Sequence, residues 1–105
     1  MTTDKQTGTP VFRVIDAMDG PHAGQLLKLR LVSGGTPALK EIKGGRFKAK
    51  SPGGQEVVVR VVGFSLMGGK PSQARFARTG RLDVVAMGED PTNPIAPRWT
   101  LTGSN

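Results

Sequence analysis

The chain has 105 residues, enough for one domain with one modest core but not for two. The absence of cysteine excludes disulfides, thiolate metal sites and a cysteine nucleophile. Fifteen Lys and Arg against eight Asp and Glu give a formal charge of +7. This charge favours a polyanionic partner such as nucleic acid, or else a basic surface with an anionic protein partner or none.

The first part of the chain predicts a tail followed by a β-hairpin. Residues 1–9 are polar without periodicity and predict a disordered tail, which leaves residues 10–105 as one domain. Residues 11–18 and 25–32 alternate as strands, and the connection between them contains two glycines and a proline. In the first strand, the alternation places Val11, Arg13, Ile15 and Ala17 on one face and Phe12, Val14, Asp16 and Met18 on the other.

The densest run of β-branched residues, 55–64, predicts a central strand. Its alternate positions 57, 59 and 61 are all valine, and the opposite face carries Val58, Arg60 and Val62. A strand that is apolar on both faces is covered on both sides or curled into a barrel. Residues 46–50 alternate basic and apolar and predict the partner strand of a second hairpin, after a short strand or helical turn at 38–43.

The C-terminal half has weaker signals. Residues 65–80 lack strand character, although 73–78 fit one helical turn with Ser72 as its N-cap. Residues 81–87 alternate as a strand, and 88–97 form a proline-rich loop. Residues 98–102 predict a short edge strand carrying Trp99. Six or seven short strands with regular turn signals predict an all-β, antiparallel fold. We expect a barrel rather than a sandwich, because the chain is short for two full sheets.

No catalytic constellation is visible. His22 is the only histidine and lies in a turn, and the glycines at 63, 68 and 69 do not match the spacing of a phosphate-binding loop. Nothing in the sequence brings two carboxylates together for acid–base chemistry. We therefore expect a protein that is not an enzyme and uses no metal or cofactor.

The basic residues are better organised than the acidic ones. Basic residues share one face of the predicted strand at 25–32 and one face of the strand at 46–50, and others lie in the segment 70–81, which has no acid. If these three groups converge, they form a surface that can contact several phosphates. Phe76 either stacks on a base from a loop or anchors that loop in the core. The candidate binding residues are Lys28, Arg30, Arg46, Lys48, Lys50, Lys70, Arg75, Phe76, Arg78 and Arg81.

Several segments resemble the β-barrel domain that follows the GTPase domain in translation factors such as elongation factor Tu. They read FRVID at 12–16, LRLVSG at 29–34, VRVVGF at 59–64 and GRLDVV at 80–85. The resemblance spans most of residues 11–88 and implies a barrel that contacts the ribosome or bound tRNA. The turn DGPHAGQ at 19–25 resembles the first hairpin of forkhead-associated domains and the KOW motif of transcription and ribosomal proteins. The later phosphothreonine-binding signature of forkhead-associated domains is missing.

We expect a cytoplasmic module that binds nucleic acid, such as RNA, or a ribonucleoprotein through its basic face. No apolar run has the length of a membrane helix or a signal core, so we expect no membrane association. The alternative is a protein-interaction module that pairs through an exposed edge strand at 98–102. The exposure of Trp99 would distinguish the two, and the sequence leaves the oligomeric state open.

Overall fold

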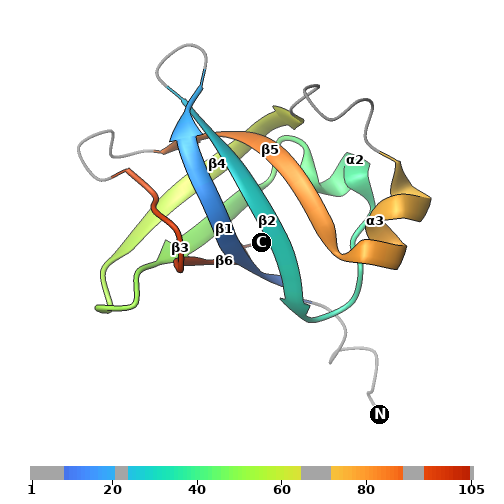
Figure 1. The fold of residues 1–105 in the computed structure, drawn as a ribbon, viewed down its shortest axis with the longest axis horizontal. Helices are drawn as coiled ribbons and strands as arrows, with labels where there is room; N and C mark the ends of the chain where they lie inside the picture. Colours follow the sequence, from blue (N-terminus) through green and yellow to red (C-terminus); the bar gives the residue numbers. More distant parts are fainter. Residues whose placement is uncertain (1–8, 21–23, 65–71, 89–93, 105) are drawn as a thin grey trace.

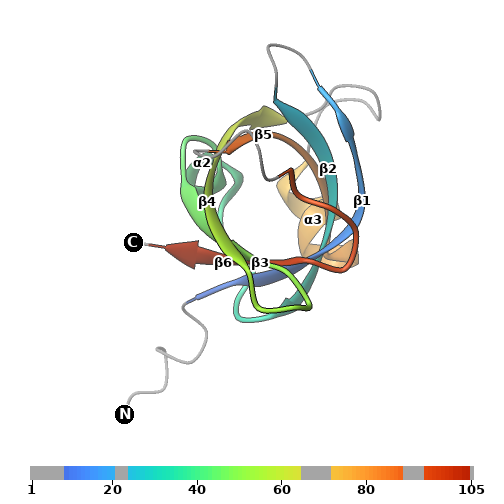
Figure 2. The same ribbon diagram turned by 90° about the vertical axis from the view of Figure 1, so that its left-hand side faces the viewer.

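The computed structural model describes residues 9–20, 24–64, 72–88 and 94–104. Six antiparallel strands close into one barrel in the order β1-β2-β5-β4-β3-β6 (Figures 1 and 2). The predicted fold class is therefore confirmed. The strands are β1 (Val11–Asp19), β2 (Gln25–Ser33), β3 (Arg46–Lys50), β4 (Glu56–Phe64), β5 (Arg81–Gly88) and β6 (Thr100–Ser104). Two short helices, α2 (Leu39–Ile42) and α3 (Gln73–Thr79), complete the described part.

Both predicted hairpins are present, since β1 pairs with β2 and β3 pairs with β4. The last strand, predicted to be an edge strand, is not at an edge. Strand β6 pairs with β1 on one side and with β3 on the other, and so it closes the barrel. A six-stranded barrel satisfies the backbone of its last strand by this closure, which alternation along one strand cannot reveal.

Strand β1 contains a bulge that changes which side chains face outward. Val14 is opposite Leu29 and Asp16 is opposite Lys28, so Ile15 is the extra residue. Before the bulge the even positions face the core, whereas after it Asp16 points into solvent and Ala17 faces inward. The simple alternation predicted for β1 is wrong beyond residue 15, because a bulge shifts the side-chain period by one.

Apolar side chains from all six strands fill the barrel. Phe12 joins two other rings of this core, with its own ring stacked on Phe76 at 6.0 Å and edge-on to Phe47 at 6.1 Å. No polar or charged residue is buried in the described part of the chain. The inward positions of the central strand β4, including Val59 and Val61, belong to this core as predicted.

Helix α3 covers one end of the barrel (Figure 1). The predicted helical turn is confirmed: the Ser72 hydroxyl accepts a hydrogen bond from the Arg75 backbone N–H, and Gly80 ends the helix with φ of 70°. The Gly80 carbonyl accepts a 2.7 Å hydrogen bond from the N–H of Leu31, which attaches the helix end to β2. The Gln73 side chain bonds the backbone of Pro37 and Leu39 and so holds α2 against α3.

The segment before β6 lies at the opposite end of the barrel (Figure 2). The Gln25 amide bonds both backbone groups of Ile95, donating at 2.8 Å and accepting at 2.9 Å. Trp99 and Ile95 are both buried in the barrel core. Among the described residues, no helix is long and apolar enough to cross a lipid bilayer.

Candidate nucleic-acid interface

Three arginines lie side by side on the outer wall of the barrel. Arg13 of β1 is opposite Arg30 of β2, and Arg30 is opposite Arg81 of β5. All three side chains are exposed. Directly opposite residues of antiparallel strands have Cβ atoms about 5 Å apart, so three positive charges meet in one line across three strands. We call Arg13, Arg30 and Arg81 the arginine row.

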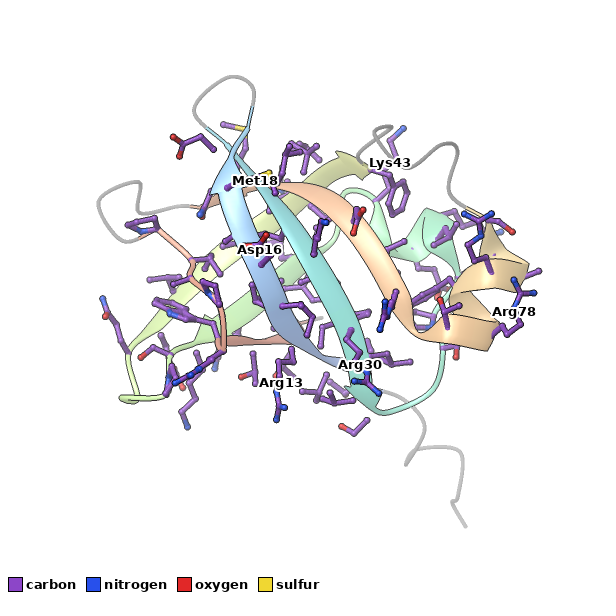
Figure 3. The ribbon with its side chains drawn as sticks, in the orientation of Figure 1. Arg13, Asp16, Met18, Arg30, Lys43 and Arg78 are labelled. Atoms are coloured by element: carbon purple, nitrogen blue, oxygen red, sulfur yellow. The ribbon has the colours of Figure 1, made fainter. Side chains whose placement is uncertain are left out.

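Among the described residues, no acid is paired with the arginine row. Within the part of the chain that the structure describes, no carboxylate forms an ion pair with Arg13, Arg30 or Arg81. Like charges directly opposite each other destabilise a sheet, and the exposed guanidinium groups keep their donors for another ligand. Figure 3 shows Arg13 and Arg30 close together, where β1 begins and β2 nears its end.

The next outward-facing row on the same three strands has more acids than bases. Lys28 of β2 lies between Asp16 of β1 and Asp83 of β5, directly opposite each. We call Asp16, Lys28 and Asp83 the mixed row. Because the bulge at Ile15 turns Asp16 outward, Lys28 has carboxylates on both sides, and the row as a whole is acidic and does not attract a polyanion.

Helix α3 places two more cations beyond the end of the arginine row. The helix passes through Gly80 directly into Arg81, and Arg75 and Arg78 lie on its exposed face. Arg78 points away from the barrel on the outer side of the helix (Figure 3). Of the predicted residues, Arg30 and Arg81 are thus directly opposite each other, and the helix that carries Arg75 and Arg78 leads directly into Arg81.

The basic residues of β3 lie on a different part of the wall. Strands β1 and β6 separate β3 from β2, so this group faces away from the arginine row. Lys48 is 3.9 Å from the Glu56 carboxylate, and Arg46 is opposite Arg60 of β4. Only Lys50 approaches the row, because it is opposite Thr100, which is in turn opposite Arg13. The predicted strand groups therefore do not form one surface.

Phe76 does not belong to the interface. Its side chain is 1% exposed and stacks on Phe12 inside the barrel. The prediction that it stacks on a base is wrong, and the alternative that it anchors its segment in the core is confirmed. The physical reason is the period of α3, which places Phe76 inward while Arg75 and Arg78 remain in solvent. Lys70 lies outside the described residues.

Sequence reasoning missed Arg13, which occupies one end of the arginine row. Its strand contains a single basic residue between apolar ones, so no local charge pattern marks it. The signal that identifies it is the register of β1 against β2, which places Arg13 opposite Arg30.

Comparison with known proteins gives no relative for this barrel. No protein-family model, curated protein or solved structure matches the chain. The functional argument therefore rests on the arginine row and its surroundings.

Trp99 and β6 bear on the protein-interaction alternative. Trp99 is 8% exposed, which argues against a role as an interface anchor. Since β6 is paired on both sides, it has no free edge to add a partner strand. The route that the sequence suggested for protein binding is thus closed in this fold.

Proposed function

We propose that this barrel is a non-enzymatic binding module that contacts the phosphate backbone of nucleic acid, alone or within a ribonucleoprotein. The observation that supports the proposal most strongly is the arginine row, with three exposed guanidinium groups in register and no described acid paired to them. Arg75 and Arg78 extend the positive surface beyond Arg81.

The chemistry of the row fits a phosphate ligand. Three cations held on adjacent strands repel one another, and a bound anion removes that repulsion while accepting charge-assisted hydrogen bonds. Arginine suits this role because its planar guanidinium donates two parallel hydrogen bonds to a phosphate. The formal charge of +7 would in addition attract a polyanion over a longer range.

The likeness of several segments to the translation-factor barrel agrees with this proposal, since in that family the barrel helps to contact the ribosome or bound tRNA. A closed antiparallel barrel is the architecture that the resemblance led us to expect. RNA is accordingly the nucleic acid with which the proposal is first tested.

The test is fluorescence anisotropy of a labelled RNA titrated with the protein at a series of salt concentrations. If five phosphates are neutralised on a duplex, the plot of log Kobs against log salt concentration has a slope of about −4 to −5. The variant R13Q/R30Q/R81Q is expected to reduce the magnitude of this slope by about 3 and to weaken binding at every salt concentration.

A control with the same loss of charge separates the row from general basicity. The variant K43Q/K48Q/R60Q removes three cations from the side of the barrel formed by α2, β3 and β4. We expect it to keep the wild-type slope within about one unit, because only long-range attraction is lost. Equal weakening by both triple variants would contradict an arginine-row site, and absence of salt-dependent binding by the wild type would contradict the proposed function.

A further inference from the structure

We infer that the nucleic acid is double-stranded and is held by its backbone without readout of bases. The inference rests on the proposed function and narrows its ligand class. It follows from where this fold places its aromatic side chains, from the shape of the wall that carries the arginines, and from the charge density that they face.

None of the Phe and Trp rings is exposed on the described surface as a platform for a base. Its aromatic residues are four Phe and one Trp, without Tyr, and all five lie in the described part. Four of them are buried, and Phe64 is half-buried and packs against the core. Proteins that bind single strands use exposed aromatic rings as stacking platforms, and this barrel keeps every such ring inside or against its core.

The shape of the site also favours a duplex. The arginine row crosses β1, β2 and β5 on the outside of a closed barrel, which is a convex wall (Figure 2). Neighbouring strands are about 4.8 Å apart, so the three Cα positions span about 10 Å. Single-strand-binding proteins combine stacking with a basic groove that follows one backbone, whereas a convex row can lie against the stiff, exposed backbones of a duplex.

Charge density sets the size of the expected preference. Each neutralised phosphate contributes a salt slope of about 0.9 on duplex DNA and about 0.7 on a single strand. For five contacts, made by the arginine row with Arg75 and Arg78, the two slopes differ by about one. Counterion release alone then favours the duplex about tenfold at about 0.1 M salt, relative to a 1 M reference. Because the Phe and Trp rings are buried or half-buried, stacking of bases on them does not offset this factor.

The experiment compares the affinity of the full chain for a DNA duplex and for oligothymidylate with the same number of phosphates, by anisotropy in one buffer. A second duplex of different base composition tests readout of bases. We expect the duplex to bind about tenfold more tightly than the single strand, and the two duplexes to bind equally within about twofold. The variant R13Q/R30Q/R81Q is expected to weaken duplex binding and to lose most of the preference, because only Arg75 and Arg78 remain of the five contacts.

Trp99 supplies a second readout that needs no label. Because it is 8% exposed in the core, its fluorescence is expected to stay unchanged when nucleic acid binds. Binding of oligothymidylate as tight as or tighter than the duplex, or quenching of Trp99 by the single strand, would overturn the inference and leave the proposed function standing. Absence of binding to all three DNA probes would overturn the inference, whereas the proposed function is overturned by absence of salt-dependent binding in the RNA titration.

Discussion

The arginine row and the mixed row lie at successive outward-facing positions of the same three strands, and they differ in the charges that they carry. In one, Arg30 lies between Arg13 and Arg81; in the other, Lys28 lies between two aspartates. Arg30 and Lys28 are two residues apart on one face of β2, and both are exposed. From the sequence alone they are equivalent candidates, whereas their cross-strand neighbours make one a cation among cations and the other a neutralised charge.

The difference shows that register, rather than the number of basic residues, defines the candidate site. The bulge at Ile15 is the local feature that separates the two rows, since without it Asp16 would face the core instead of pairing with Lys28 on the outer wall. A single extra residue in a strand thereby divides this face into a cationic row and a row in which acids outnumber bases.

The largest effect is expected from the residue that fixes α3 beside the arginine row. Replacing Phe76 by alanine removes a ring stacked on Phe12 and leaves a cavity, so the free energy of unfolding should fall by about 3–5 kcal/mol. Urea denaturation followed by circular dichroism measures the loss. Phe76→Leu retains most of the apolar volume and is expected to lose clearly less, and it keeps the test usable if the alanine variant does not fold.

A loss below about 1 kcal/mol for Phe76→Ala would mean that α3 is not anchored in the core. In that case Arg75 and Arg78 would not have a fixed place beside Arg81, and the candidate site would consist of the arginine row alone.

The mixed row offers a second, smaller test. Lys28→Glu would place three acids in line, and the two new like-charge pairs should lower the free energy of unfolding by about 1 kcal/mol at low salt. Added salt should reverse most of the loss by screening. The neutral variant Lys28→Gln should lose about half as much. If Lys28→Glu is as stable as the wild type at low salt, the charges on opposite strands do not interact measurably.

Local patterns in the sequence predict most of the elements. Alternation at 11–18 and 25–32, the valine-rich run at 55–64 and the glycines between them suffice for two hairpins, because period and turn chemistry are local properties. Ser72 and the spacing of apolar residues after it likewise identify α3. These patterns need no knowledge of the partner strand.

The candidate site is less predictable, because it depends on contacts between distant residues. Arg13 joins Arg30 through the β1–β2 register, and Arg81 reaches them only because β5 pairs with β2 across the barrel. The predicted grouping of Lys48 with Arg30 is wrong for the same reason, since closure by β6 separates their strands. Phe76 is ambiguous in the sequence because a ring between two arginines fits both a loop platform and a core anchor.

The most direct test of the account is the variant Arg30→Glu, measured for both stability and binding. It gives the arginine row the alternating charges of the mixed row, because a glutamate then lies between two arginines. We expect the free energy of unfolding at low salt to rise by about 1 kcal/mol, because two repulsive cross-strand pairs become attractive. Affinity for a nucleic-acid duplex should fall by at least about tenfold, since one cation is lost and an anion takes its place. A variant that is less stable than the wild type, or one that binds the duplex as tightly, would contradict the central claim.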